Sequence, residues 1–427
     1  MNNRLATSHR KWITGVIAVT AASLALAGCS ASTDSSSESG GNITLKLAAF
    51  GDATQVKVLA EQYSEKNPNI TVEVAAAANA GDARTSLLTK LAAKTGLADV
   101  EQLEVSWIGE LAPYSSSFNP VVDDGNGGWL ASQAEPVTKD GELWAYGAGA
   151  GPMAICYHAD ALAAAGMPSE PDAVAEMLGT SWDDYFAAGE KFAAAGGAGA
   201  WYDSAYQTYQ AQLEQMPYPY EDADDKIVVD NPEVEAIFKN SLKESETLSA
   251  RLIPFSEDWM AGMGSSAYAT IACPTWMLGM IEGNSADVTD WRVANSFPGG
   301  GGNAGGSYYA VPAVSEHPKE AAALAAWLTA PEQQIALFMA GGAFPSREEA
   351  LTSPDLTTVT NAFFGDASVG EIFADRSKAI NVVTYKGPNF LAIDTVVFDA
   401  MSRVEAGQQS TDDAWDQIVK ESKALAD

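Results

Sequence analysis

The feature that most constrains the fold is an alternation of strand and helix patterns between residues 43 and 105. Apolar residues alternate along each predicted strand and recur at helical spacing along each predicted helix. The order is strand, helix, strand, helix, strand, at residues 43–47, 56–63, 70–74, 82–94 and 100–105. This order predicts an α/β fold with a mainly parallel sheet and helices on its faces.

Ligands of such sheets bind beyond the carboxyl ends of the strands. Two of these ends read Phe50-Gly51-Asp52 and Glu104-Val105-Ser106-Trp107. We therefore expect Asp52, Glu104 and Trp107 to lie at a ligand site. For the two carboxylates, a helix cap or an ordinary loop position is the alternative.

Composition excludes several classes of partner. The chain has 427 residues, of which 47% are hydrophobic, so it can bury the cores of two or three domains. Its 56 acidic and 24 basic residues give a formal net charge of −32. So acidic a surface argues against nucleic acid and anionic membrane surfaces as partners and disfavours phosphorylated ligands.

The N-terminus predicts export. Basic residues, including Arg4 and Lys11, precede an uncharged apolar run at 12–28. This order is typical of a secretory signal peptide (residues 1–28), and an uncleaved helical anchor is the alternative. The run ends in Leu26-Ala27-Gly28-Cys29, which resembles the lipobox of bacterial lipoproteins. The resemblance implies lipidation of Cys29 and a place on the extracellular face of the cell membrane, with a flexible Ser/Gly linker at 29–42.

Two further cysteines, Cys156 and Cys273, form an even pair. In an oxidising compartment such a pair favours a disulfide. Two buried free thiols are the alternative, and the sequence leaves both open.

The sequence carries no catalytic or cofactor motif. It has no G-x-S-x-G, no H-E-x-x-H and no clustered Cys/His set, and His158 and His317 are isolated. The glycine-dense segment 146–152 leads into a strand rather than a helix, so it does not fit a dinucleotide site. It suits a place where the backbone crosses between lobes or approaches a ligand closely. Residues 123–127 lack the final Glu of a calcium loop. We expect no enzyme activity, metal or cofactor, although a glycosidase carboxylate pair stays open.

Several motifs follow one another in order along the chain: Ala98-Asp99-Val100, Gly151-Pro152-Met153, Cys156-Tyr157, Ala165-Gly166-Met167-Pro168, Asp203-Ser204-Ala205, Cys273-Pro274-Thr275-Trp276-Met277-Leu278-Gly279, Gly305-Gly306-Ser307-Tyr308, Phe344-Pro345-Ser346, Arg403-Val404-Glu405 and Ala414-Trp415. Through these motifs the whole mature chain resembles family-1 extracellular solute-binding proteins of ABC importers, in the actinobacterial branch for cellobiose- and xylobiose-type oligosaccharides. The family commonly has Trp where Ala304 stands and Arg where His158 stands. These departures point to a ligand that differs from cellobiose in length or linkage.

The resemblance implies two α/β lobes of the periplasmic-binding-protein type (type II), joined by a hinge and closing on a sugar. We place lobe 1 at residues 43–148 and 295–342, and lobe 2 at 149–294 and 343–427. The expected role is capture of an oligosaccharide, most simply a β-linked gluco-, xylo- or manno-oligosaccharide, by a monomer that delivers it to an ABC permease. The alternatives are another polar solute on the same scaffold and a secreted glycosidase.

A neutral sugar needs hydrogen-bond partners for its hydroxyls and aromatic rings for its C–H faces. Trp276 follows the helix-breaking Cys-Pro-Thr and is predicted to be a stacking platform, with a core position as the alternative. Trp201, beside Asp203, is predicted to stack as well. The full predicted ligand set is Asp52, Glu104, Trp107, Trp201, Asp203, Ser204, Trp276, Gly306, Ser307, Tyr308, Arg347 and Lys386.

Overall fold

The computed structural model describes residues 41–265 and 267–426. The signal peptide, Cys29 and nearly all of the predicted linker lie outside these residues. The strands are β1 (Ile43–Phe50), β2 (Ile70–Ala77), β3 (Val100–Glu104), β4 (Thr138–Lys139), β5 (Glu142–Leu143), β6 (Tyr146–His158), β7 (Thr270–Pro274), β8 (Trp291–Ala294) and β9 (Asn303–Ala310).

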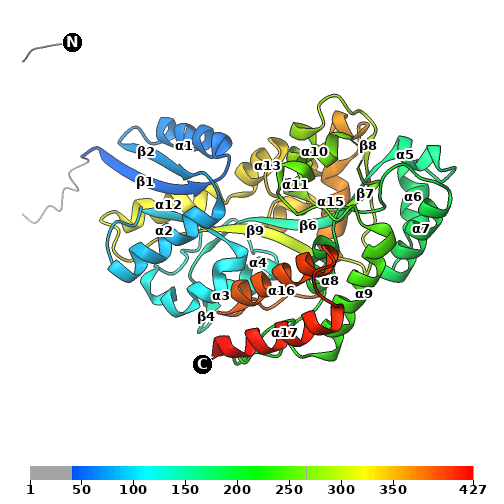
Figure 1. Cartoon of the computed structure of the whole chain (residues 1–427). Coiled ribbons are helices and arrows are strands. Elements are labelled where there is room, and N and C mark those ends of the chain that lie inside the picture. The colour runs from blue at the N-terminus through cyan, green and yellow to red at the C-terminus, as the bar shows by residue number, and fades with distance from the viewer. Residues whose placement is uncertain (1–40, 266, 427) are drawn as a thin grey trace, which may run out of the picture. The chain divides into compact units, whose positions relative to one another are not determined.

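The α-helices, several of which are labelled in Figure 1, are α1 (Thr54–Lys66), α2 (Ala80–Ala93), α3 (Ile108–Leu111), α4 (Ala131–Ala134), α5 (Ala159–Ala164), α6 (Pro171–Leu178), α7 (Trp182–Ala194), α8 (Ala205–Leu213), α9 (Pro232–Leu248), α10 (Glu257–Ser265), α11 (Thr275–Asn284), α12 (Pro318–Leu328), α13 (Pro331–Met339), α14 (Pro354–Thr357), α15 (Val369–Lys378), α16 (Phe390–Glu405) and α17 (Thr411–Lys423). Short 3-10 helices are η1 (Val105–Trp107), η2 (Ala112–Ser117), η3 (Glu135–Val137), η4 (Glu348–Thr352), η5 (Ala362–Phe364) and η6 (Ala424–Ala426).

The first five elements follow the predicted order. Helix α1 buries the face that its spacing predicts, including Val56, Leu59 and Tyr63. Helix α2 begins at a polar cap, because the Asn79 side chain accepts a hydrogen bond from the Asp82 backbone N–H at 2.9 Å. Local periodicity and capping therefore account for this part of the fold.

The prediction of a mainly parallel sheet is wrong for most strand pairs. β1 is parallel to β2 and β3, but β9 is antiparallel to β3 and β6, and β7 and β8 are antiparallel to β6. The main sheet has the order β2-β1-β3-β9-β6-β7, with β8 also paired to β6. The reason is that β6 and β9 cross between the two halves of the molecule in opposite directions, instead of being joined by a β-α-β crossover.

Strand β6 runs through both halves, and every one of its 13 residues is buried. Its first part pairs with β9 and its second part with β7 and β8. At the crossing the backbones touch, because a Cβ on Gly151 would lie 2.3 Å from the Ala304 carbonyl oxygen. The glycine-dense segment is thus a place of close backbone crossing, as its composition predicts.

Apolar side chains gather separately on the two sides of this crossing. One cluster packs around β1 and β3 and includes Leu45, Leu47 and Val100. Other clusters pack around the second part of β6, including Ile155, and between α8, α9 and α16. In Figure 1 the first side, with α1 and α2, lies at left, and α5 to α7 lie at right. The expected two-lobed α/β fold is confirmed, and the residue boundaries of the lobes stay a prediction.

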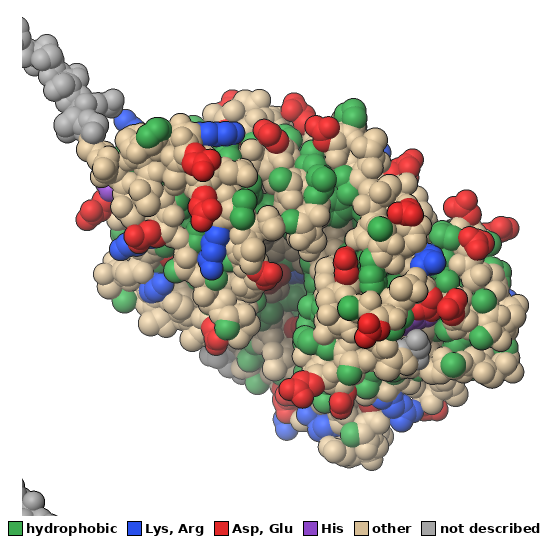
Figure 2. Space-filling view, turned by 90° about the horizontal axis from the view of Figure 1, so that it is seen from above, with side chains coloured by type: hydrophobic (Ala, Val, Ile, Leu, Met, Phe, Trp, Pro, Cys, Tyr) green, Lys and Arg blue, Asp and Glu red, His purple; other side chains and the backbone are tan. Residues whose placement is uncertain are grey.

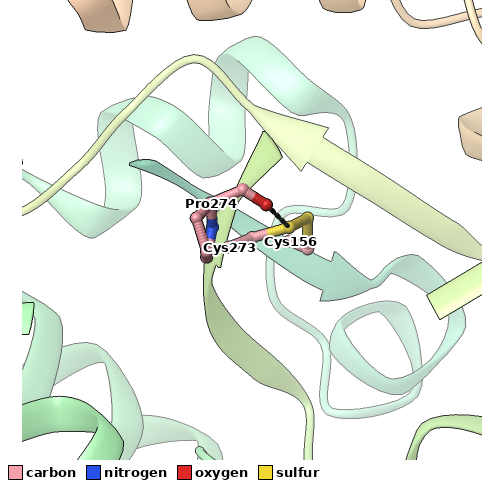
Figure 3. The surroundings of a disulfide bond; sticks show 3 residues. All are labelled: Cys156, Cys273 and Pro274. Atoms are coloured by element: carbon pink, nitrogen blue, oxygen red, sulfur yellow. Dashed lines mark hydrogen bonds between the residues drawn. A yellow bond between two sulfur atoms is a disulfide. The ribbon is translucent and has the colours of Figure 1, made fainter. Parts of the chain in front are cut away.

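A disulfide joins the paired strands β6 and β7. Cys156 and Cys273 are both fully buried, their Cα atoms are 5.6 Å apart, and their sulfur atoms are bonded (Figure 3). The structure therefore holds the disulfide rather than two free thiols.

Two features are absent from the described residues. Within 41–265 and 267–426, no helix combines the length and the apolar character needed to cross a membrane. The same part of the chain has no group of three or more His, Cys, Asp or Glu side chains placed to hold a metal ion.

Candidate functional site

A cavity of about 410 Å³ lies where the two lobes meet. One wall comes from η1, α3 and α4 of the first lobe, and the other from the segments that follow α8 and precede α16 in the second. Figure 2 shows that the surface is hollowed between the two halves of the molecule. The two walls are in close backbone contact at Gly109. A Cβ atom built on this glycine would lie only 1.9 Å from the Lys386 carbonyl oxygen, so no larger residue fits there.

A larger groove, of about 940 Å³, runs between residues 119–126 and α12. All its lining residues belong to the first lobe, so movement of the lobes cannot enclose a ligand there. The smaller cavity, which both lobes line, is therefore the candidate site.

The second-lobe wall carries a nearly buried ion pair. Lys386 Nζ lies 2.7 Å from Glu214 Oε1, and the two side chains are 9% and 10% exposed. Burial acts to lower the pKa of the Lys386 ammonium group. The charge of Glu214 and its hydrogen bond to Lys386 act in the opposite direction, and the pKa is raised on balance. The pair therefore places an ammonium group and a carboxyl group on the cavity wall, where they can hydrogen-bond polar groups of a ligand.

Glu104 lies opposite this pair, at the end of β3. Its carboxylate accepts a hydrogen bond from the Ser106 backbone N–H at 2.9 Å, so the helix-cap alternative holds for one of its oxygens. Burial raises the pKa of Glu104, and the nearby Lys386 acts against that rise. With Glu135 also on the wall, carboxylates outnumber the single cation, which disfavours an anionic ligand.

Trp276 contacts β9 near this cavity but is not one of its lining residues. It is the second residue of α11, directly after β7, and its indole is half-buried. Its Nε1–H donates to the Ala304 carbonyl at 2.9 Å, next to Asn303, which lines the cavity. Gly306 and Ser307, also in the predicted set, are half-buried on the same strand. This position leaves part of the Trp276 ring open, as a stacking platform requires.

The prediction for Trp201, Asp203 and Ser204 needs correction. The Trp201 side chain is 1% exposed and packs against Tyr185, with the two ring centroids 5.5 Å apart. Asp203 accepts a hydrogen bond from Trp259 Nε1 at 2.7 Å, and burial raises its pKa to about 7. Ser204 caps α8. These three residues are buried in the second lobe, where Trp201 packs among aromatic rings, Asp203 is bound by Trp259 and Ser204 caps α8, and none of them lines the cavity.

Arg347 also lies away from the ligand cavity. Its side chain is fully buried and forms an ion pair with Asp124. It donates to the Thr329 carbonyl at 3.1 Å and to the Gly127 carbonyl at 2.6 Å, and its guanidinium lies 3.5 Å from the Trp129 ring centroid. Arg347 therefore fastens the segment after α13 to the loop before α4, and the predicted ligand contact is wrong.

The remaining predicted residues support the cavity from outside. Trp107 is buried and packs against Phe50 with ring centroids 5.4 Å apart, and Tyr308 is fully buried. Asp52 is exposed and accepts a hydrogen bond from the Thr54 backbone N–H at 2.9 Å. Hydrogen bonding by the Thr54 side chain, and then by its backbone N–H, lowers the pKa of the Asp52 carboxyl. Asp52 does not line the cavity and is not the N-cap of α1, which is Ala53, so the loop-position alternative describes it.

Sequence reasoning missed most side chains of the cavity, among them Glu214, Tyr218 and Tyr385. The two tyrosine ring centroids lie 6.0 Å apart on the second-lobe wall. A signal existed in the Tyr- and Pro-rich segment 216–220 and in Tyr385 beside Lys386. Nothing in the sequence pairs these two distant segments.

Comparisons with known proteins agree with this geometry. A family model described as bacterial extracellular solute-binding protein matches residues 58–363. A crystal structure of a family-1 extracellular solute-binding protein is 38% identical, with a TM-score of 0.84, covering 90% of this chain and 100% of that chain. A search of curated proteins found no match.

Two more distant structures share the fold. The ABC transporter-associated binding protein of B. animalis subsp. lactis is 22% identical, with a TM-score of 0.71 and coverage of 90% of this chain and 96% of that chain. The GacH receptor of Streptomyces glaucescens is 17% identical, with a TM-score of 0.70 and coverage of 90% and 98%. With two lobes around a shared cavity and a family match over most of its length, the chain belongs to the extracellular solute-binding proteins of family 1.

Proposed function

We propose that this protein is the substrate-binding component of an ABC importer and captures a neutral oligosaccharide in the cavity between its lobes. The observation that carries the proposal is the composition of that cavity. It brings the Glu214–Lys386 pair together with Tyr218, Tyr385 and the neighbouring Trp276. Charged hydrogen-bond partners suit sugar hydroxyls, and aromatic rings suit the apolar faces of sugar rings.

The structural neighbours support a sugar. The B. animalis protein was solved with β-1,6-galactobiose and the GacH receptor with acarbose. A related fold from Agrobacterium vitis holds D-mannitol, which keeps a polyol as the alternative ligand. We favour the oligosaccharide, in particular a β-linked gluco-, xylo- or manno-oligosaccharide, because aromatic side chains such as Tyr218 and Tyr385 line the cavity beside its polar groups.

Capture follows from the two-lobed arrangement. The lobes are expected to move about the crossing of β6 and β9, with lobe 1 at 43–148 and 295–342 and lobe 2 at 149–294 and 343–427. A sugar that contacts both walls stabilises the closed state by its extra contacts there. The closed monomer then presents the sugar to permease subunits in the membrane.

The test is calorimetric titration of the purified protein with cello-, xylo-, manno- and gluco-oligosaccharides and with mannitol. A disaccharide of about 23 heavy atoms at roughly 0.3 kcal/mol per atom gives about 7 kcal/mol, so a Kd near the micromolar range is expected. Binding of mannitol alone would favour the polyol. Release of shorter sugars during incubation would show a glycosidase instead.

Trp276→Ala should weaken sugar binding roughly ten- to a hundredfold, because it removes a stacking face worth about 1–3 kcal/mol. The melting temperature should stay near that of the wild type, since the indole is half-buried. Titration and thermal melting of the same variant check this, with Trp276→Phe as a control that keeps an aromatic face. A large drop in melting temperature would show that Trp276 is a core residue.

The anchor is a separate proposal, which rests on the Leu26-Ala27-Gly28-Cys29 sequence. Cys29→Ser should release the protein from membranes or block its processing, because the lipidated thiol is lost. Fractionation and mass spectrometry of the N-terminus check this. A wild-type protein that is wholly in the culture medium, with an unmodified N-terminus, would contradict it.

A further inference from the structure

Glu221 is a fully buried carboxylate in the second lobe. It accepts hydrogen bonds from the Asn389 backbone N–H, at 3.0 Å to Oε1 and 3.2 Å to Oε2, and from Asn389 Nδ2 at 3.0 Å. These donors are neutral amide groups, so they do not compensate the charge as a cation would. Burial raises the pKa of Glu221, and the hydrogen bonds from Asn389 act against that rise. Burying a charge in this way costs folding free energy, which points to a role beyond stability.

The carboxylate packs against the segment that carries Lys386. A Cβ atom built on Gly387 would lie 2.5 Å from Glu221 Oε2, so this glycine is in direct contact with the carboxylate. Lys386 immediately precedes Gly387, and Asn389 follows two residues later, directly before α16. Glu221 therefore holds the segment 386–389 at two of its residues, one on each side of Pro388.

The same segment forms the contact with the first lobe. A Cβ atom on Gly109 of α3 would lie 1.9 Å from the Lys386 carbonyl oxygen and 2.3 Å from the Gly387 carbonyl oxygen. The Lys386 side chain lines the cavity, and its Nζ lies 2.7 Å from Glu214 Oε1. The backbone position of residues 386 and 387 thus sets both where the ammonium group lies and where the two walls meet.

From this arrangement we infer that Glu221 is a positioning residue, which holds Lys386 at the cavity wall through its contacts with Asn389 and Gly387. The inference rests on the proposed function and adds to it the support of the cation in the site. Glu221 does not line the cavity, so it acts on a ligand through Lys386. A group that is already fixed in its binding position loses less conformational freedom when the ligand arrives, which strengthens binding.

The experiment follows Lys386 in two ways. The first is its rate of acetylation by acetic anhydride, measured by mass spectrometry. In the wild type this rate should be lower than that of Lys378, because the Lys386 side chain is 9% exposed and that of Lys378 is 56% exposed. Glu221→Ala should raise the Lys386 rate severalfold and leave the Lys378 rate unchanged. Glu221→Gln should stay near the wild type, because its Oε1 can accept from both Asn389 donors.

The second measurement is calorimetric titration with the cello-, xylo-, manno- and gluco-oligosaccharides. Lys386→Met should weaken sugar binding roughly ten- to a hundredfold, as loss of a hydrogen bond to a charged group does. Glu221→Ala should weaken it roughly tenfold, at the lower end of that range. The two changes together should weaken binding no more than Lys386→Met alone, because Glu221 acts through Lys386. A merely structural role predicts that the two losses add.

Asp222→Ala is the matched control for removal of a carboxylate from the same turn. Asp222 accepts hydrogen bonds from the Asp224 and Lys226 backbone N–H groups, at 3.0 and 3.1 Å. Its loss should change neither the acetylation rate of Lys386 nor the sugar affinity. Thermal melting shows whether each variant folds. If Glu221→Ala does not fold, Asn389→Ala takes its place, since it removes only the Nδ2 donor, and it should raise the Lys386 rate by a smaller factor.

The outcomes separate this inference from the proposed function. If the wild type binds no sugar, the proposed function fails, while the acetylation rates still decide whether Glu221 positions Lys386. An unchanged Lys386 rate in the folded Glu221→Ala or Asn389→Ala variant overturns the inference. If the wild type binds sugar, an unchanged affinity of Glu221→Ala, or losses that add in the double variant, overturns the inference and leaves the proposed function standing.

Discussion

Arg347→Met should lower the free energy of unfolding by about 3–5 kcal/mol, because it leaves the Asp124 carboxylate without its buried partner. The variant also loses the hydrogen bonds to the Thr329 and Gly127 carbonyls and the contact with Trp129. Denaturant titration of wild type and variant measures the difference. The ligand-contact interpretation predicts the opposite, namely unchanged stability with weakened sugar binding.

A double variant sharpens this test. Replacing both charges, as in Arg347→Met with Asp124→Leu, should recover part of the lost stability, since no buried charge then lacks a partner. Lys378→Met is the control for loss of a cation. Lys378 forms a 3.6 Å ion pair with Asp375, but both side chains are exposed to solvent, so the pair contributes little to stability. This substitution should change stability by less than about 1 kcal/mol.

Removing the disulfide should lower the free energy of unfolding by about 2–5 kcal/mol. The bond between Cys156 and Cys273 spans 117 positions, and a crosslink over so long a loop strongly restricts the unfolded chain. The measurement compares denaturant unfolding of wild type with that of Cys156→Ala/Cys273→Ala. Addition of a reductant should destabilise the wild type and leave the double variant unchanged.

A thiol assay on the denatured but unreduced protein tests the bond directly. With the disulfide formed, only Cys29 can contribute, and in the Cys29→Ser variant no thiol should react. Two reactive thiols per chain in that variant would show that Cys156 and Cys273 are free.

Local patterns predicted local structure well. The order of elements up to β3 follows from apolar spacing and from caps such as Asn79, which involve neighbours a few positions away. The glycine-dense segment predicts the crossing at Gly151, because only a residue without Cβ fits there. The pairing of β9 with β3 and β6 depends on partners far apart in the chain. The prediction of a mainly parallel sheet was wrong for these pairs, which are antiparallel.

Residue type alone did not place the site. Trp201 and Trp276 are both tryptophans beside polar residues, yet the first is in the core and the second is half-exposed. Asp203 is buried because Trp259, 56 positions later, supplies its hydrogen bond. Glu214 and Lys386, the ion pair of the cavity, are 172 positions apart. The sequence predicted Lys386 from its motif and could not predict its partner.

The place of β9 between β3 and β6 also sets the order in which the protein can assemble as it is made. The first lobe needs residues Asn303–Ala310 to complete its sheet, and these are synthesised only after the long segment of the second lobe that runs from β6 to β8. Until then β3 and β6 expose unpaired edges, and closing so long a loop is slow. The sheet of the first lobe can therefore be completed only late in synthesis, after residue 310 has been made.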